Sequence, residues 1–234
     1  MTVKLWVIVP AAGSSRRMTG AALPKQYLPL AGRTVIEWAI APFLERADCE
    51  RIVVVLAEQD RHWPELALAR HPKIVTATGG AERVDSVRAG LRALASQAKA
   101  HDWVLVHDAA RPCLRASDLN RLIVELADDS VGGLLAAPVV DTLKRGDCGG
   151  RVQETVPRAS LWRALTPQMF RYSVLDRALS AAGELRATPT DEAQAVEALD
   201  LEPRLVRGDP DNIKITLPED VERAARLLKS WSAA

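Results

Sequence analysis

The stretch Val7–Leu28 reads VIVPAAGSSRRMTGAALPKQYL, and the rest of the chain is organised around it. An apolar run is followed by small residues, then by Arg16 and Arg17, and later by Lys25 after a proline. A buried strand that opens into a loop of small residues lets a ligand approach the backbone, and the free N–H groups of such a loop bind phosphate. Three cations beside one turn are costly unless they are solvated or paired with anions. The stretch therefore predicts a polyphosphate site at the end of the first strand.

Neither common glycine-rich nucleotide motif is present in this stretch. A P-loop would read G-x-x-x-x-G-K-[ST], and a dinucleotide fingerprint would read G-x-G-x-x-G. Gly13 and Gly20 have the wrong spacing for both motifs. An ordinary strand-to-helix turn would explain the small residues alone, so the phosphate hypothesis depends on the nearby cations. The missing glycine pattern also disfavours a Rossmann-type reductase.

Length and composition set outer limits on the function. The 234 residues can bury a core, and 48% hydrophobic with 26% charged residues is typical of a soluble globular protein. A net charge of +1 gives no overall attraction to nucleic acid or to anionic membranes. We find no signal peptide pattern and no apolar run that could span a membrane. Three widely spaced cysteines indicate reduced thiols rather than a disulfide framework or a zinc site, so we expect a cytoplasmic protein.

Apolar runs typical of strands alternate with helical patterns along the chain. Residues 51–56 form a continuous β-branched run, as in a strand that is buried on both faces. Thr34 is a suitable N-cap for an amphipathic helix. The alternation predicts an α/β fold, a Rossmann-like, mostly parallel sheet with helices on both faces, in a single domain of residues 1–234. The predicted strands are 5–9, 51–56, 73–76, 103–106, 132–140 and one within 209–216, and the predicted helices are 34–44, 63–70, 83–95, 117–126 and 218–231.

Residues 138–158 interrupt this alternation. The segments 139–145 and 151–156 are joined by the glycine-rich residues 146–150, which predicts a protruding β-hairpin arm. A lone two-stranded hairpin is only marginally stable in water, so we expect the arm to pack on something, and a second subunit is the economical candidate. A loose surface loop is the alternative, and the sequence does not choose between them.

Polar residues follow the predicted strands at the ends where a parallel sheet binds ligands. The segments concerned are Thr78–Arg83 with Ser86, His107–Pro112, and Asp141 with Thr142 and Lys144. We expect them to meet the first loop at one edge of the sheet. A metal-dependent phosphohydrolase built on His107 and Asp108 ranks low, because the other three histidines lie in unhelpful contexts.

The motifs Pro10-Ala11-Ala12-Gly13, Arg16-Arg17-Met18 and Pro24-Lys25-Gln26-Tyr27-Leu28 resemble the opening signature of nucleotidyltransferases that activate sugar and polyol phosphates. Within these enzymes the chain is most similar to the 2-C-methyl-D-erythritol 4-phosphate cytidylyltransferase family of the non-mevalonate isoprenoid pathway. The resemblance covers nearly the whole chain. It implies transfer of a cytidylyl group from CTP to 2-C-methyl-D-erythritol 4-phosphate. The alternatives are a cytidylyltransferase for another polyol phosphate, such as ribitol 5-phosphate, and, more distantly, a non-catalytic nucleotide-binding protein.

The resemblance also implies roles for particular residues. Its catalytic cations would be Arg17, Lys25 and Lys214. Its nucleotide-binding residues would be Pro10, Ala11, Ala12, Gly13, Gly79, Gly80, Ser86, Asp108 and Ala109. The acceptor would be bound by Arg111, Thr142 and Thr166, and by Arg158 lent from the second subunit of a homodimer that exchanges the arm. Mg²⁺ would bridge the triphosphate, with Asp108 and Asp211 as carboxylates on the metal side, acting directly or through water.

Further expectations concern positions around this site. Trp162 is predicted to be a core residue, and residues 190–193 are predicted to start a helix with capping chemistry. Residues 18–25 are one residue longer than the family pattern, which bears on how Lys25 is placed. Ala81 stands where the family often has an acidic residue, so main-chain contacts are expected there.

Overall fold

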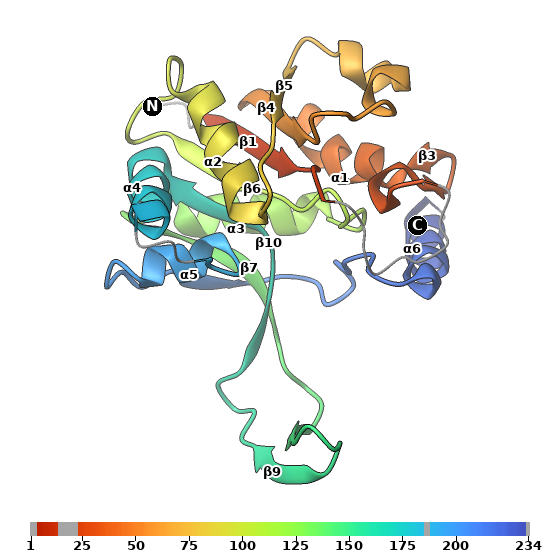
Figure 1. The fold of residues 1–234 in the computed structure, drawn as a ribbon, viewed down its shortest axis with the longest axis vertical. Coiled ribbons are helices and arrows are strands. Elements are labelled where there is room, and N and C mark those ends of the chain that lie inside the picture. Colours follow the sequence, from red (N-terminus) through yellow and green to blue (C-terminus); the bar gives the residue numbers. More distant parts are fainter. Residues whose placement is uncertain (1–3, 14–22, 185–187, 233–234) are drawn as a thin grey trace.

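The structure, a computed structural model, describes residues 4–13, 23–184 and 188–232. Its central sheet has seven strands: β1 (Leu5–Pro10), β4 (Cys49–Leu56), β5 (Ile74–Thr78), β6 (Trp103–Val106), β7 (Gly132–Pro138), β10 (Trp162–Arg171) and β11 (Arg204–Arg207). Across the sheet they follow the order β11-β7-β10-β6-β1-β4-β5. The pairs are parallel except those made by β10, which is antiparallel to β6 and β7. The predicted α/β fold with a mostly parallel sheet is confirmed (Figure 1).

The centre of the sheet is apolar on both faces. β1 lies between β4 and β6, and every residue from Leu5 to Val9 is buried. The β-branched run from Ile52 to Val55 in β4 is buried as well. Strands that are covered on both faces read as continuous apolar runs, which is why these two could be recognised from the sequence.

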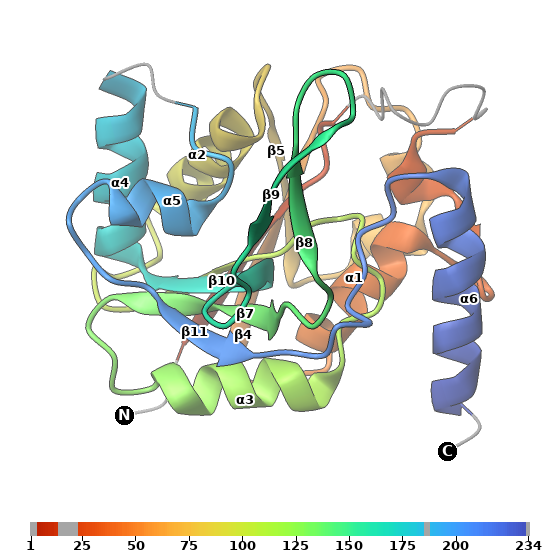
Figure 2. The same cartoon turned by 90° about the horizontal axis from the view of Figure 1, so that it is seen from below.

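Helices cover both faces of this sheet (Figure 2). They are α1 (Val35–Leu44), α2 (Arg83–Leu94), α3 (Ala116–Leu126), α4 (Tyr172–Glu184), α5 (Glu192–Glu197) and α6 (Pro218–Ser232). α1 and α3 pack on one face, and α2, α4 and α5 pack on the other. α6 packs beside the sheet against α1 and β2 (Pro29–Leu30), which forms a short hairpin with β3 (Arg33–Thr34). Within the described ranges, no helix is long and apolar enough to cross a membrane.

The predicted cap of α1 is confirmed, whereas the predicted start of α3 is wrong. The hydroxyl of Thr34 accepts from the N–H of Glu37, and the Glu37 carboxylate accepts from the N–H of Thr34 at 2.7 Å. α3 begins at Ala116 rather than Ser117, and its N-cap residue, Arg115, makes no side-chain capping bond. The apolar face of α3 packs on the sheet, and such packing can fix the start of a helix without a cap.

Residues 63–70 were expected to form one short helix, and this prediction is wrong. They form two 3₁₀ turns, η2 (Trp63–Glu65) and η3 (Ala67–Arg70). Leu66 between them is extended, with φ −78° and ψ 136°, so an α-helical hydrogen-bond ladder cannot pass through it. The Trp63 side chain is buried in the core, which indicates that tertiary packing shapes this segment.

The last strand lies earlier than predicted. β11 pairs in parallel with β7, whereas residues 209–216, where a strand was expected, form a loop. The N–H of Asp209 donates to the Asp118 carboxylate at 2.7 Å, and the N–H of Ile213 donates to the carbonyl of Asp211 at 2.7 Å. These backbone groups are satisfied locally and by a side chain, so they are not free to extend the sheet.

The predicted arm is present and projects away from the sheet (Figure 1). Its antiparallel strands are β8 (Leu143–Gly146) and β9 (Val152–Val156), so β8 starts later than expected. β7 correspondingly ends at Pro138 rather than at residue 140. Trp162, expected in the core, is 38% exposed, because the first residues of β10 lie at the neck of the arm, outside the covered part of the sheet.

Candidate active site

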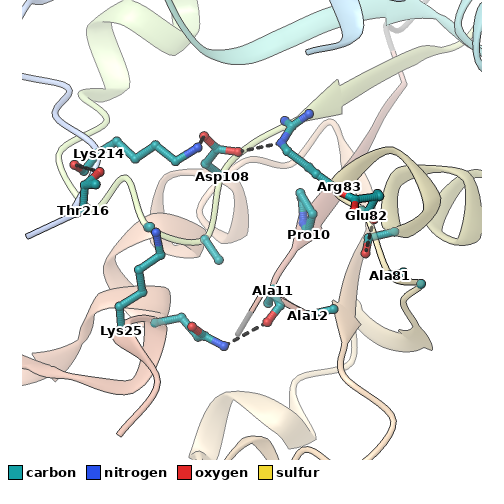
Figure 3. Close-up of a pocket in the computed structure, with 16 residues that line it drawn as sticks. Pro10, Ala11, Ala12, Lys25, Ala81, Glu82, Arg83, Asp108, Lys214 and Thr216 are labelled. Atoms are coloured by element: carbon teal, nitrogen blue, oxygen red, sulfur yellow. Dashed lines mark hydrogen bonds and ion pairs between the residues drawn. The ribbon is translucent and has the colours of Figure 1, made fainter. Parts of the chain in front are cut away.

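A cavity of about 680 Å³ lies beyond the carboxyl ends of β1, β5 and β6 (Figure 3). This is the sheet edge at which the sequence predicted a site. The predicted catalytic and nucleotide-binding residues that line it are Pro10, Ala11, Ala12, Gly13, Lys25, Gly80, Ser86, Asp108, Ala109 and Lys214. Segments from both ends of the chain therefore meet at one cavity.

The loop after β1 is fastened on two sides. The N–H of Ala11 donates to the carbonyl of Val55 at 2.8 Å, which continues the pairing with β4. The carbonyl of Ala11 accepts from the side-chain amide of Gln26, which is buried, at 2.9 Å. Gln26 lies in the 3₁₀ turn η1 (Lys25–Tyr27), so this bond holds Lys25 close to the loop. The Lys25 ammonium donates to the carbonyl of Ile215 at 3.1 Å.

Two sequence predictions fall outside the described residues. Arg17, expected to act in catalysis, lies in the segment 14–22, and so does most of the segment 18–25, which is one residue longer than the family pattern. The role of Arg17 stays a prediction.

The Gly79-Gly80 turn is shaped by close packing. A Cβ at Gly79 would lie 2.6 Å from the Ser86 hydroxyl oxygen and 2.7 Å from Cβ of Ala12, and a Cβ at Gly80 would lie 2.4 Å from Cβ of Asp85. A larger residue at position 79 would push this turn away from the first loop, and one at position 80 would push it away from Asp85 in α2. Of the two glycines, the cavity lining includes Gly80, so we assign Gly79 a packing role beside the site.

Asp108 lies at the centre of a cluster of cations. Its Oδ1 lies 3.1 Å from Nε of Arg83, and its Oδ2 lies 2.8 Å from Nζ of Lys214. Nε of Arg111 lies 3.6 Å from the same Oδ2. Burial alone would raise the pKa of Asp108, but these cations outweigh it and hold the pKa well below its usual range. Asp108 is therefore ionised under all ordinary conditions.

Arg83 and Glu192 lie in segments that the sequence analysis named, but neither was assigned a role in the site. Arg83 opens α2, and its terminal nitrogens donate to the two oxygens of Glu192 at 2.5 and 3.0 Å. Burial would lower the pKa of Arg83, but Glu192 and Asp108 raise it, so the guanidinium stays charged. The two residues are 109 positions apart, and no local sequence pattern connects them.

His107 and Thr166 fix the turn that carries Asp108. Burial lowers the pKa of His107 to about 4, so its ring is neutral at pH 7. Nε2 lies 3.1 Å from the carbonyl of Arg111, which can only accept, so Nε2 carries the proton. Nδ1 then accepts from the Thr166 hydroxyl at 2.9 Å, and that hydroxyl accepts from the N–H of Asp108 at 3.1 Å. In this structure the hydroxyl of Thr166 shapes the Asp108 turn, and its contact with an acceptor stays a prediction.

Of the remaining predicted acceptor residues, Arg111 lies beside Asp108, and the other two lie at the neck of the arm. Arg111 donates to the carbonyl of Asn212 at 2.7 Å, so it points along the loop that carries Lys214. Thr142 and Arg158 are exposed at the neck of the arm, where the Arg158 guanidinium donates to the carbonyl of Val140. Neither residue is among those that line the cavity of its own chain. This is expected of Arg158 if it acts in a neighbouring subunit, whereas Thr142 was expected to bind the acceptor in its own subunit, and that role stays a prediction.

The carboxylates expected on the metal side do not fit direct coordination of Mg²⁺. Both oxygens of Asp108 face cations, and Asp211 pairs with Arg223 at 3.5 Å outside the described cavity lining. No group of three or more His, Cys, Asp or Glu side chains in the described part of the chain is placed to hold a metal ion. These contacts argue against direct coordination by Asp108 or Asp211, and a role for either residue through water stays a prediction.

The family model of IspD, described as 2-C-methyl-D-erythritol 4-phosphate cytidylyltransferase, matches residues 5–230. The chain belongs to this family. Relatives with that name include one from Ectopseudomonas mendocina (strain ymp), 53% identical over 99% of this chain and 97% of its own length. Another, from Pseudomonas aeruginosa (strain UCBPP-PA14), is 54% identical over 94% of each chain.

Solved structures agree with the IspD family assignment. A crystal structure of 4-diphosphocytidyl-2C-methyl-D-erythritol synthase is similar with a TM-score of 0.84 and 37% identity, over 97% of this chain and 99% of that one. The Francisella tularensis 2-C-methyl-D-erythritol 4-phosphate cytidylyltransferase (IspD) gives 0.83 and 33%, over 96% and 99%. These matches confirm the predicted family and fold. They support 2-C-methyl-D-erythritol 4-phosphate rather than ribitol 5-phosphate as the acceptor, and they identify the chain as a cytidylyltransferase.

Proposed function

We propose that this cavity is where the chain transfers the cytidylyl group of CTP to 2-C-methyl-D-erythritol 4-phosphate. The products are 4-diphosphocytidyl-2-C-methyl-D-erythritol and pyrophosphate, in the synthesis of isoprenoid precursors. The observation that carries the proposal is the meeting of Lys25, Lys214 and the small-residue loop 10–13 at one cavity beyond the parallel strands. Exposed backbone N–H groups and flexible cations are the groups that recognise a polyphosphate.

The reaction needs charge stabilisation more than proton transfer. A phosphate oxygen of the acceptor attacks the α-phosphorus of CTP, and the bond from that phosphorus to the oxygen of the leaving pyrophosphate breaks. The attacking oxygen is already anionic, so no general base is required. This agrees with His107, whose ring nitrogens are both bonded inside the protein. Lys25, Lys214 and Arg17 are proposed to stabilise the charge on the transferring group and on pyrophosphate.

The two substrates are proposed to bind on different sides of Asp108. The loop 10–13, Gly80, Ser86 and Ala109 form the nucleotide side. Arg111, Thr142 and Thr166, with the partner's Arg158, form the acceptor side. Mg²⁺ enters the proposal as a companion of the triphosphate, since neither Asp108 nor Asp211 is placed to bind it directly.

We also propose that the arm joins two copies of the chain. All residues of β8 are exposed, and the arm and its neck expose Val140 (73%), Val152 (64%) and Trp162 (38%). A two-stranded hairpin with exposed apolar side chains is poorly stable alone, and a second subunit would cover it. We also propose a cytoplasmic location, which the three free cysteines support. A single nucleotidyltransferase domain is a further proposal, supported by a central sheet whose strands lie between residues 5 and 207.

The direct test is pyrophosphate release with a panel of nucleotides crossed with a panel of polyol phosphates. We expect release with CTP and 2-C-methyl-D-erythritol 4-phosphate, and much slower release with UTP or with ribitol 5-phosphate. Equal or faster release with ribitol 5-phosphate would reject the proposed acceptor, and no release with any pair would reject the proposed activity.

A further inference from the structure

Two cations share the Asp108 carboxylate, but they are held in different ways. Arg83 donates to Asp108 from Nε at 3.1 Å and to Glu192 from both terminal nitrogens at 2.5 and 3.0 Å. Lys214 lies 2.8 Å from Asp108 and pairs with no other carboxylate of the described chain. Arg83 is therefore tethered on two sides and Lys214 on one.

Glu192 contacts this cluster inside the protein and is not among the described residues that line the cavity. Arg83 lines the cavity, whereas the Glu192 side chain is 1% exposed and lies outside the described lining. The start of α5 is fixed to the sheet by Gln168, which accepts from the N–H of Ala193 at 2.8 Å and donates to Asp191 at 2.9 Å. A two-bond pair between a guanidinium and a carboxylate, anchored on rigid elements, sets the plane and position of the guanidinium.

We propose that Glu192 is a positioning residue for cytidylyl transfer. It occupies the terminal nitrogens of Arg83 and so keeps that guanidinium on Asp108. Among the described residues, Lys214 is held by one carboxylate, whereas Arg83 is held by two. Lys214 is then the cation that moves from Asp108 to the phosphates when CTP binds. This inference rests on the proposed function, in which Lys214 contacts the phosphates.

The charges of the cluster give the inference a distinctive consequence. Arg83, Arg111 and Lys214 face two carboxylates, Asp108 and Glu192, which leaves one positive charge in excess beside the cavity. If Glu192 loses its charge, the half-buried guanidinium of Arg83 keeps only the Asp108 carboxylate, which it shares with Lys214, and its terminal nitrogens become free for another anion. In the proposed function that anion is the triphosphate, because Arg83 lines the cavity.

Glu192→Gln should therefore bind CTP more tightly and turn over more slowly. Arg83 would add a charge-assisted bond to the phosphates in the ground state, and we expect the Kd of CTP to fall about fivefold. The same move takes Arg83 off Asp108 and leaves Lys214 held there, so we expect kcat to fall about tenfold. A residue with only a structural role would not tighten CTP binding while slowing transfer.

The experiment measures CTP binding by calorimetry and pyrophosphate release on wild type, Glu192→Gln and the double variant with Arg83→Gln. The double variant should lose the tighter binding, because it has no guanidinium to release. Glu197→Gln, an exposed position on the same helix α5, is the matched control and should behave as wild type. Thermal unfolding shows whether each variant is folded.

Wild-type CTP binding or wild-type turnover in folded Glu192→Gln overturns the inference, and so does tighter binding that persists in the double variant. If Glu192→Gln does not fold, Glu192→Asp is used, because it keeps the buried charge but shortens its reach. It should show smaller shifts in the same two directions, and unchanged values in both would overturn the inference. A wild type that binds CTP but releases no pyrophosphate would instead reject the proposed function.

Discussion

The cavity and the arm contain ion pairs of the same type and length in opposite surroundings. Arg83 and Glu192 lie 2.5 Å apart with side-chain exposures of 27% and 1%, and Arg145 and Glu154 lie 2.5 Å apart with exposures of 62% and 52%. At the cavity the Glu192 charge is fully buried and the Arg83 charge is partly buried, so Glu192 depends on Arg83 as its counter-charge. On the arm, water can replace either partner at little cost. The two ion pairs therefore have the same distance but are expected to contribute differently to stability, because one is buried and the other is exposed.

The largest expected effect is on stability, at the buried pair. Glu192→Ala leaves Arg83 without its partner on one side, and we expect it to lower the free energy of unfolding by about 3–5 kcal/mol. Glu154→Ala on the arm should lower it by less than about 1 kcal/mol. Urea unfolding of both variants measures the difference. Equal losses would show that burial does not separate the two regions.

The arm should respond to a change that leaves the cavity untouched. Val152→Asp places a charge on an apolar side chain of β9 that is 64% exposed, and we expect it to weaken a dimer by at least about tenfold in Kd. Val124→Asp, on α3 and 73% exposed, is the matched control outside the arm. Sedimentation of both variants over a range of concentrations provides the measurement. A dimer that survives Val152→Asp, or a wild type that is monomeric throughout, would contradict the proposed role of the arm.

A smaller, pH-dependent effect is expected at His107. Its pKa is lowered from 6.5 to about 4 by burial, so between these values the unfolded chain binds a proton that the folded chain does not. The contribution of His107 to the free energy of unfolding is therefore fully present above pH 6.5. It is lost as the pH falls from 6.5 towards 4, by up to about 1.4 kcal/mol per pH unit. His107→Asn should flatten this slope, measured by urea unfolding from pH 7 to pH 4.5. An unchanged slope in the variant would show that His107 is not its source.

The sequence predicted the elements that local patterns encode. Residues 5–9 and 51–56 read as buried strands because both of their faces are covered, and the placement of Asp108 and Arg111 followed from the rule that ligands bind beyond parallel strands. Thr34 was recognisable because a capping box lies within four residues.

What could not be predicted depends on contacts between distant residues. Arg83 meets Glu192 across 109 positions, and Thr166 meets His107 across 59, so neither pair leaves a periodic trace in the sequence. Trp162 was assigned to the core because it is large and apolar, but its exposure depends on where the arm leaves the sheet. The loop at 209–216 looked like a strand because its bonds to Asp118 and within the turn are not visible in its own composition.

The central claim is that cations at the cavity stabilise charge during cytidylyl transfer, and Lys25 tests it most directly. Lys25→Ala should lower kcat by about 100–1,000-fold at saturating CTP and 2-C-methyl-D-erythritol 4-phosphate, with a much smaller change in the KM for CTP. Lys229→Ala, an exposed lysine of α6, is the control. Turnover within a few-fold of wild type in a folded Lys25→Ala variant would contradict the account.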